Sequence, residues 1–192
     1  MKLCFASNND HKLSEIRQIV GNQYQVVSLQ EIGCHEELAE DQDTLEGNSR
    51  QKAEYVWQHY GISCFADDTG LEVAALGGEP GVFSARYAGP QRSSSDNMTL
   101  LLENLRSQSD RRAQFRTSIT LFLDGAMHQF DGIIKGQIAD APRGETGFGY
   151  DPIFIPEGSE LTFAQMSAGE KNQISHRGRA MEQLVAFLQK QK

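Results

Sequence analysis

The chain opens with a short, mostly apolar segment, residues 2–6, whose composition predicts a strand. A polar turn follows at residues 7–12, and the next apolar positions recur at the spacing of one helix face: Leu13, Ile16, Ile19 and Val20. We therefore expect the turn at the N-terminus of a helix, where free backbone amides and the helix dipole attract phosphate. Lys12 would add a mobile charge there. An ordinary capped helix start with a surface lysine explains the same pattern.

Further along, the same patterns predict one strand and two helices, at residues 24–28, 44–59 and 95–106. Residues 115–123 alternate between apolar and polar side chains, which is typical of a strand with one buried face. Asp124 and Gly125 form a strong signal for a two-residue hairpin turn, so the chain should return antiparallel as far as Lys135. Such a hairpin argues against a purely parallel, doubly wound sheet.

The strand predicted at residues 62–66 is too apolar for a solvated edge, and we expect it to stop at Asp67 and Asp68. Acidic pairs at the end of a buried strand suit Mg²⁺, which takes oxygen ligands and usually keeps several waters for substrate phosphates. A simple turn is the alternative, because aspartate, threonine and glycine are common turn residues. The glycine-rich loop at residues 77–81 and the cation of Arg86 lie just beyond, and this combination favours polyphosphate chemistry.

A second glycine-rich loop at residues 144–152 runs into the apolar residues 153–155. It therefore precedes a strand and does not form a dinucleotide-binding fingerprint, which would open a helix. Its glycines would let the backbone approach a flat ligand, with Phe148 available for stacking and Asp151 as an acceptor. A tight loop with a buried phenylalanine is the competing interpretation.

Basic residues gather near the C-terminus. Ser167 and Glu170 have the spacing of a capping box for a short helix. Lys171, His176 and Arg177 then precede a final helix, where cations oppose the helix dipole. That helix is amphipathic, with inward positions Met181, Leu184, Val185 and Leu188. Cations at the start of a helix break this local rule. Such an exception often marks a site where another group, here an anion or a carbonyl group, compensates the positive charge.

The length and composition of the chain indicate one sizeable domain, or two lobes that share a core. The chain has 192 residues, of which 39% are hydrophobic and 23% charged, as expected of a globular protein. No apolar run approaches the roughly 20 residues of a membrane span, and the N-terminus turns polar too soon for a secretory signal. The cysteines lack CxxC spacing and predict reduced, buried thiols in a cytoplasmic protein: Cys4, Cys34 and Cys64. A formal charge of -8 argues against a nucleic-acid polymer as ligand, but not against a small anion in a local basic pocket.

The acidic segment at residues 36–43 offers a further ligand for a metal at Asp68. One carboxylate from this segment could complete the site. A merely solvated acidic run is the alternative explanation.

With these segments in view, the chain resembles the inosine/xanthosine triphosphate pyrophosphatase family, whose members remove non-standard purine nucleotides. Six segments carry the resemblance: SNNDHK at residues 7–12, TLEGN at 44–48, ADDTG at 66–70, PGVFSARY at 80–87, GFGYDP at 147–152 and KNQISHR at 171–177. Each is weak evidence alone. The set is specific, because the segments appear in family order and span nearly the whole chain.

The resemblance implies an α/β fold in which a long mixed β-sheet is flanked by helices. It implies a single domain over residues 1–192, with two lobes and a central cleft. It also implies a homodimer that requires Mg²⁺ and cleaves ITP, XTP or their deoxy forms between the α and β phosphorus atoms. The products would be the monophosphate and pyrophosphate, and neither a nucleic-acid polymer nor a membrane is expected as a partner.

Carried across position by position, the resemblance implies a role for each matching residue. The triphosphate would be held by Ser7, Asn8, Asn9, Asp10, His11 and Lys12. Asp68 would accept a proton from the attacking water, and it would bind the metal together with Glu40. Glu37 or Asp41 could replace Glu40, because this acidic segment aligns loosely with the family. Thr69 would contact the substrate. The base would be framed by Phe148, Gly149, Tyr150, Asp151, Lys171, His176 and Arg177.

Such a base pocket presents hydrogen-bond donors. They would match the 6-oxo group of hypoxanthine and xanthine, and they would be left unpaired by the 6-amino group of adenine. Two alternatives stay open, namely a Maf-type pyrophosphatase for pyrimidine or modified nucleotides and a nucleotide-binding regulator without turnover. The segments at residues 148–151 and 171–177 argue against the first. The full set of carboxylates, lysine and arginine argues against the second.

Overall fold

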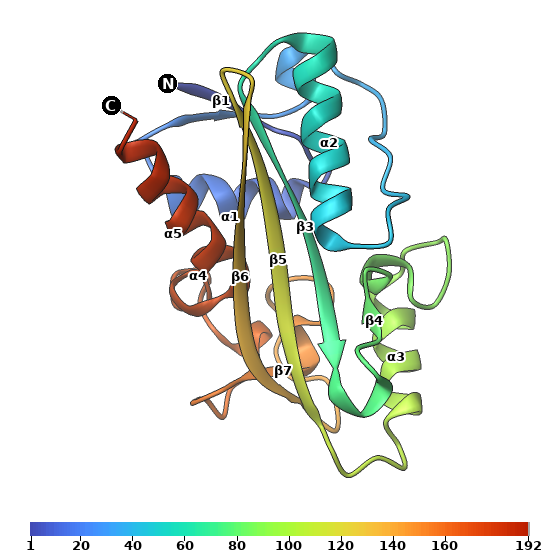
Figure 1. Cartoon of the computed structure of the whole chain (residues 1–192). Helices are drawn as coiled ribbons and strands as arrows, with labels where there is room; N and C mark the ends of the chain where they lie inside the picture. The colour runs from blue at the N-terminus through green and yellow to red at the C-terminus, as the bar shows by residue number, and fades with distance from the viewer. Residues whose placement is uncertain (192) are drawn as a thin grey trace. The chain divides into compact units, whose positions relative to one another are not determined.

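The computed structural model describes residues 1–191, and the chain divides into two compact units. The first unit comprises Met1–Asp68, Thr117–Gly132 and the C-terminal segment from Arg177, and the second comprises Thr69–Arg116 and Ile133–His176. Three long strands contribute residues to both units: β3 (Cys64–Val73), β5 (Arg112–Leu123) and β6 (Ala126–Ile138) (Figure 1). The seven-stranded sheet has the order β2-β1-β3-β5-β6-β7, with β4 paired to β3.

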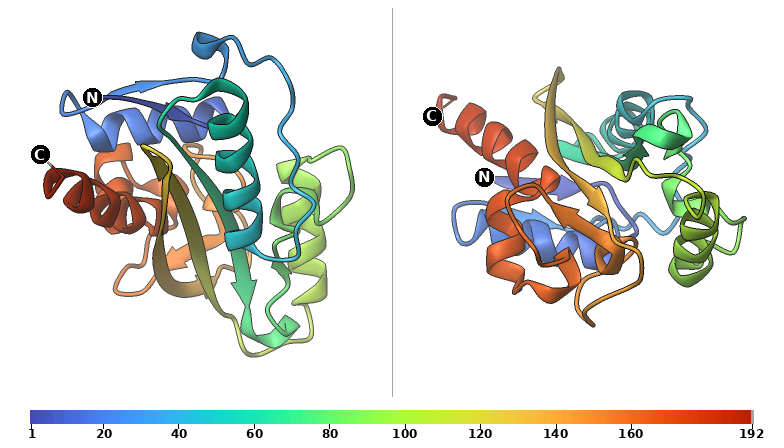
Figure 2. Two further views of the ribbon diagram at one scale, coloured as in Figure 1. Left: turned by 45° about the horizontal axis from the view of Figure 1, so that its top comes forward. Right: turned by 90° about the horizontal axis from the view of Figure 1, so that it is seen from below.

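In the first unit, β1 (Lys2–Phe5) pairs in parallel with both β2 (Gln25–Val27) and β3. Its side chains alternate between two layers, as strand geometry requires. Leu3 and Phe5 pack with helices α1 (Asp10–Val20) and α5 (His176–Gln189). Cys4 and Ala6 pack with helix α2 (Leu45–Tyr60) on the other face of the strands (Figure 2).

The second unit contains α3 (Ser94–Asn104), α4 (Ala168–Ile174), β4 (Pro80–Gly81) and β7 (Phe154–Pro156). Its core gathers aromatic rings from β5, β7 and the segment after it, including Phe115, Phe154 and Phe163. Strands β4 and β7 each pair antiparallel with a neighbour. Because β1 and β2 are parallel, the sheet is mixed and flanked by helices, which confirms the predicted fold class.

Short 3₁₀ turns complete the secondary structure at Gln30–Ile32, Ala74–Leu76, Ser84–Arg86, Asp151–Ile153 and Phe163–Gln165. The predicted hairpin joins β5 to β6, where Asp124 (φ 49°) and Gly125 (φ 87°) both adopt left-handed conformations, as a type I′ turn requires. The three cysteines are buried free thiols, as predicted. Within residues 1–191, no helix has the length and apolarity needed to cross a membrane.

Several predicted boundaries shift by one or a few residues, and the predicted end of one strand is wrong. Helix α1 begins at Asp10, capped by the Asn9 side chain, so the polar turn is shorter than residues 7–12. Helix α5 begins at His176, so His176 and Arg177 form its first turn and do not precede it. The strand predicted to stop before the acidic pair continues to Val73.

Strand β3 can carry two carboxylates in its interior because each has its own partners on its own face. Beyond the two carboxylates, β3 also pairs with β4, where Leu71 lies opposite Gly81. Gly70 is required at this approach, because a Cβ there would lie 2.6 Å from the Gly81 carbonyl oxygen. The simple turn considered for Asp67 and Asp68 is therefore excluded, and the alternation of a strand directs the two side chains to opposite faces.

Candidate active site

Asp67 is the centre of a buried charge cluster on the face that packs against α1 and α5. Its Oδ1 accepts a hydrogen bond from Lys12 Nζ at 3.1 Å, and its Oδ2 accepts two from Arg177 at 3.1 Å each. Arg177 Nη1 also donates to Glu15 at 2.5 Å. Burial would raise the pKa of Asp67, but Lys12, Arg177 and Lys52 outweigh it and hold that pKa far below its usual range. Asp67 is therefore a permanently ionised support.

This cluster corrects two expectations. Lys12 is not a mobile surface charge, because its side chain is 13% exposed and paired with Asp67. The compensation for a cation at the start of α5 comes from the protein's own carboxylates, since Arg177 binds Asp67 and Glu15. Burial would lower the pKa of Arg177, and these two acids raise it.

Asp68 points to the opposite face, toward α2. Its Oδ2 accepts a hydrogen bond from Asn48 Nδ2 at 2.9 Å. Burial raises the pKa of Asp68, and the positive charges of Lys52 and Lys12 offset only part of this effect. The neighbouring Glu40 carboxylate increases it further. A buried carboxylate with a raised pKa is a stronger base than an ordinary one, which suits a proton acceptor.

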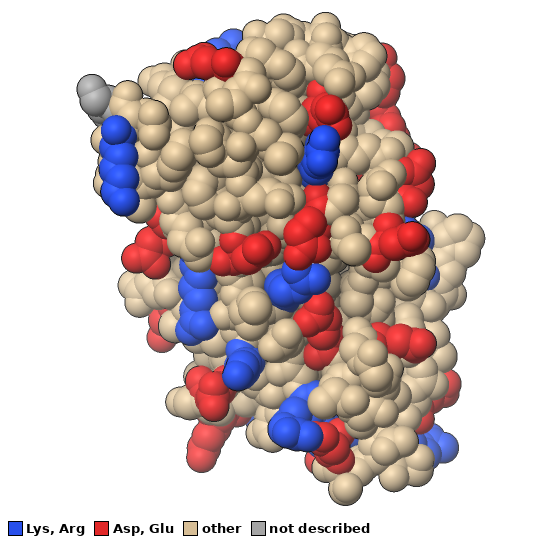
Figure 3. Space-filling model, in the orientation of Figure 1, with Lys and Arg blue, Asp and Glu red and all other residues tan. Residues whose placement is uncertain are grey.

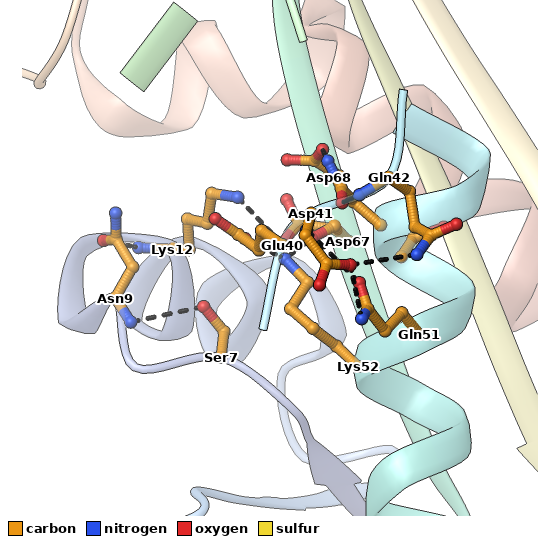
Figure 4. Close-up of polar contacts among 12 residues, drawn as sticks. Ser7, Asn9, Lys12, Glu40, Asp41, Gln42, Gln51, Lys52, Asp67 and Asp68 are labelled. Atoms are coloured by element: carbon orange, nitrogen blue, oxygen red, sulfur yellow. Dashed lines mark hydrogen bonds and ion pairs between the residues drawn. The ribbon is translucent and has the colours of Figure 1, made fainter. Parts of the chain in front are cut away.

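Lys52 joins the loop that carries Glu40 to strand β3. Its Nζ donates to Glu40 Oε1 at 2.5 Å and to the backbone carbonyl of Asp67 at 2.7 Å, and its side chain is only 4% exposed. Burial would lower the pKa of Lys52, but Glu40, Asp68 and Asp67 outweigh it and raise the pKa. Lys52 thus brings a fixed positive charge beside the two predicted metal ligands, as Figure 4 shows.

Lys52 is not among the predicted site residues, although a pattern in the sequence identifies it as a buried polar residue of α2. The buried positions of α2 follow helical spacing, and three of them are polar: Asn48, Ser49 and Lys52. Polar side chains on the stripe of a helix that faces the core need partners inside the protein. Here Asn48 and Lys52 contact the carboxylates of the candidate site, whereas Ser49 hydrogen-bonds to Thr120.

The donor set fits a magnesium ion. Among residues 1–191, no group of three or more His, Cys, Asp or Glu side chains is placed to hold a metal ion by itself. Mg²⁺, however, is usually bound through one or two carboxylates with waters and substrate phosphates. Glu40 and Asp68 supply two carboxylates, and the raised pKa of Asp68 means that a cation beside it would favour its charged form.

The first loop presents polar groups at the N-terminus of α1. Ser7 Oγ accepts from the Asn9 N–H at 3.2 Å, and Asn9 Oδ1 accepts from the Lys12 N–H at 3.1 Å. Asn8, Asp10 and His11 are exposed. This arrangement keeps a helix N-terminus accessible to a phosphate group.

In the second unit, Asp151 organises the other glycine-rich loop. Its Oδ2 accepts from Lys171 Nζ at 2.7 Å and from the Phe148 N–H at 2.8 Å. The positive end of Lys171 also lies 4.9 Å from the centre of the Phe148 ring. Gly147 (φ 78°) is required, because a Cβ there would lie 2.1 Å from Asp151 Oδ2.

The two interpretations of the loop differ in where the Phe148 side chain lies. Its ring is half-buried, so the loop is not built on a fully buried phenylalanine. Tyr150 and His176 do belong to the core: the Tyr150 hydroxyl donates to the Ser84 carbonyl at 2.8 Å, and the His176 ring stacks on Phe115 with centroids 4.6 Å apart.

The predicted site residues are distributed over the two units as follows. The first unit holds Ser7, Asn8, Asn9, Asp10, His11, Lys12, Glu40, Asp68 and Arg177. The second holds Thr69, Phe148, Gly149, Tyr150, Asp151, Lys171 and His176. Of the alternatives to Glu40, Asp41 binds Gln51 instead.

A separate cavity of about 700 Å³ lies in the second unit, and its lining includes Glu72, Arg112, Lys135 and Glu157. None of the predicted site residues lines it. Charged side chains of both signs are also interspersed over the face of the molecule seen in Figure 3.

Comparison with known proteins supplies independent information. The sequence model of the Ham1 family matches residues 3–187. A dITP/XTP pyrophosphatase of Flavobacterium johnsoniae is 52% identical over 188 residues, which cover 98% of each chain. One from Porphyromonas gingivalis is 55% identical over 188 residues and 97% of each chain. The structure of the Staphylococcus aureus Ham1 protein is similar with a TM-score of 0.90, at 41% identity and 100% coverage of both chains.

Proposed function

The chain belongs to the Ham1 family, and from this premise we propose that it hydrolyses non-standard purine nucleoside triphosphates, such as dITP and XTP, to the monophosphate and pyrophosphate. Its relatives of 52% and 55% identity are dITP/XTP pyrophosphatases. The observation in the structure that best supports the proposal is Asp68, a buried carboxylate with a raised pKa, close enough to Glu40 and Lys52 for their charges to affect it.

Hydrolysis of a triphosphate requires charge neutralisation, an oriented water and a base. Asp68 is the base in our proposal, held through Oδ2 by Asn48. Lys52 neutralises negative charge beside it, and Asp67 keeps Lys12 in place at the first turn of α1. When bound at Glu40 and Asp68, Mg²⁺ supplies charge neutralisation at the phosphates and a lower pKa for the attacking water.

We assign the leaving pyrophosphate to the first loop. The positive end of the α1 helix dipole favours an anion there. Ser7, Asn8 and Asn9 carry polar groups at this position, and Lys12 brings a charge within the first turn.

We assign recognition of the base to Lys171 and Phe148. The ammonium group of Lys171 is a donor next to an aromatic ring, and Asp151 holds it in place. A 6-oxo purine satisfies such a donor, and a 6-amino purine leaves it unpaired. A mismatch of this kind can lower kcat/KM for the mismatched purine by about 10⁴-fold.

The first experiment is a substrate panel. Purified protein with Mg²⁺ would be given ITP, dITP, XTP, GTP, ATP and a pyrimidine triphosphate, and pyrophosphate release would be measured. We expect kcat/KM for ITP and XTP to exceed that for ATP by at least about 10²-fold, within the range that unpaired donors produce. Equal rates on ATP and ITP would overturn the base assignment, and a preference for pyrimidines would favour a Maf-type enzyme.

A magnesium requirement, a homodimer and a cytoplasmic location complete the proposal. The two carboxylates at Glu40 and Asp68 support the first, and the family resemblance supports the second. Three buried free thiols agree with a reducing compartment. Excess EDTA should stop pyrophosphate release and added Mg²⁺ restore it. Analytical ultracentrifugation should give twice the mass of one chain, and cell fractionation should locate the protein.

A further inference from the structure

One buried amide connects the two carboxylates that the proposed function places at the metal. Asn48 is 1% exposed and uses both ends of its side chain. Its Nδ2 donates to Asp68 Oδ2 at 2.9 Å, and its Oδ1 accepts from the Gln42 N–H at 2.9 Å. Gln42 lies two residues after Glu40, so one planar group links strand β3 to the loop that carries Glu40.

The orientation of this amide follows from its neighbours. The Gln42 N–H can only donate, so it needs the amide oxygen of Asn48. The amide nitrogen of Asn48 is then directed at Asp68, whose Oδ2 accepts from it. Rotating the amide by half a turn would break both hydrogen bonds at once.

Two further side chains of α2 bind the same loop, as Figure 4 shows. Gln51 Nε2 donates to Asp41 Oδ1 at 2.7 Å, and Lys52 Nζ donates to Glu40 Oε1 at 2.5 Å. Loop residues 40, 41 and 42 are therefore held in sequence by positions 52, 51 and 48 of the helix. Of these three helix residues, Asn48 also donates to Asp68.

The segment TLEGN at residues 44–48 thereby gains a physical explanation. Thr44 caps α2 by accepting from the Gly47 N–H at 3.0 Å. Gly47 lets the loop lie directly on the first turn, because a Cβ there would approach Gln42 Cβ to 2.8 Å. Asn48 then fastens the loop to β3.

We propose that Asn48 is a positioning residue for the pyrophosphatase reaction, because it holds the Asp68 carboxylate and the Glu40 loop in one fixed arrangement. The proposal rests on the proposed function. A shift of the loop moves the partner of the amide oxygen, and the amide nitrogen then leaves its place on Asp68. A displacement of about 1 Å at a reacting group can lower turnover by about 10²-fold.

Three variants separate the two contacts. Asn48→Ala removes both. Asn48→Asp keeps an acceptor for the Gln42 N–H and loses the donor to Asp68. Gln51→Ala is the matched variant, because it loosens the loop at Asp41 and leaves the contact between Asn48 and Asp68 intact.

The variants would be compared by kcat and KM for ITP with Mg²⁺, and by hydrogen–deuterium exchange of residues 40–43 without nucleotide or metal. We expect kcat to fall by about 10²-fold in Asn48→Ala and Asn48→Asp, with a smaller fall in Gln51→Ala. Exchange should rise in Asn48→Ala and Gln51→Ala and stay close to wild type in Asn48→Asp.

The outcomes are distinguishable. Wild-type kcat in Asn48→Asp, or an equal fall in Gln51→Ala and Asn48→Ala, would overturn the link to Asp68. Unchanged exchange in Asn48→Ala would overturn the link to the loop. If Asn48→Ala fails to fold, Asn48→Asp still decides through its kcat and exchange. If the wild type does not hydrolyse ITP, the proposed function fails, whereas the exchange data still report on the linkage.

Discussion

The two faces of β3 at Asp67 and Asp68 differ more than their adjacency in the chain would lead one to expect. On one face, Asp67 is fully buried between α1 and α5, paired with Lys12 and Arg177, and its pKa is lowered. On the other, Asp68 is 8% exposed, faces α2, and has a raised pKa caused first by burial. The pKa values of two identical side chains are thus shifted in opposite directions.

The difference shows that two adjacent acidic residues in a strand do not bind one metal ion together. Side chains of adjacent strand residues point to opposite faces, so the two carboxylates cannot share a ligand in the way that neighbours in a loop can. In the function we propose, this separation lets Asp67 serve stability and Asp68 serve chemistry. Pairs of titratable groups whose surroundings move their pKa values apart are a common basis for such division of roles.

The largest expected effect comes from the reactive face. Asp68→Asn should lower kcat for ITP by about 10³-fold, since removal of a general base typically lowers the rate by 10²–10⁴-fold. The fold should be retained, because asparagine relieves the burial of a charge. Pyrophosphate release and a thermal melt measure the two properties. Turnover within about tenfold of wild type would assign the base elsewhere.

On the face that carries Asp67, a substitution should lower the stability of the fold. Asp67→Asn leaves Lys12 and Arg177 without the anion between them, and breaking a buried ion pair in this way costs about 3–5 kcal/mol of unfolding free energy. Urea unfolding measures the loss, with Asp68→Asn as the matched control. Equal stability losses in the two variants would show that the faces do not differ as we describe.

The pH dependence sharpens the same contrast. The pKa of Asp67 is lower in the folded than in the unfolded chain, so its contribution to stability is present above the unfolded pKa of about 4 and is lost as the pH falls below it. The stability difference between wild type and Asp67→Asn should be constant between about pH 7 and pH 5 and shrink below about pH 4. Urea midpoints across this range test it, and a difference that grows on acidification would contradict the assignment.

The sequence predicted those parts of the fold that depend on local pattern. The helix expected at residues 44–59 is α2, which Thr44 caps, and Ser167 and Glu170 form the predicted capping box. The turn at Asp124 and Gly125 was recognisable because few residues adopt left-handed conformations. The family resemblance is also confirmed, since it depended on six separate segments in order.

The strand end and the role of the charges were harder to predict, because they depend on distant partners. Arg177 reaches Asp67 across 110 positions in the chain and Lys12 reaches it across 55, so no local pattern shows that the Asp67 charge is satisfied inside a strand. The polar stripe of α2 with Asn48 and Lys52 was visible in the sequence, but its meaning required the loop that it binds.

The smallest expected effect lies at the outer edge of the supporting cluster. Glu15 accepts from Arg177, but its side chain is 15% exposed and Arg177 keeps two hydrogen bonds to Asp67. Glu15→Gln preserves an acceptor oxygen and removes only the charge, so we expect a loss of about 1 kcal/mol or less in unfolding free energy and unchanged kcat for ITP. A loss as large as that of Asp67→Asn, measured by urea unfolding under the same conditions, would mean that Glu15 contributes as much as Asp67 to the compensation of Arg177. The stability contribution of this face of β3 would then come from the whole charge cluster and not from Asp67 alone.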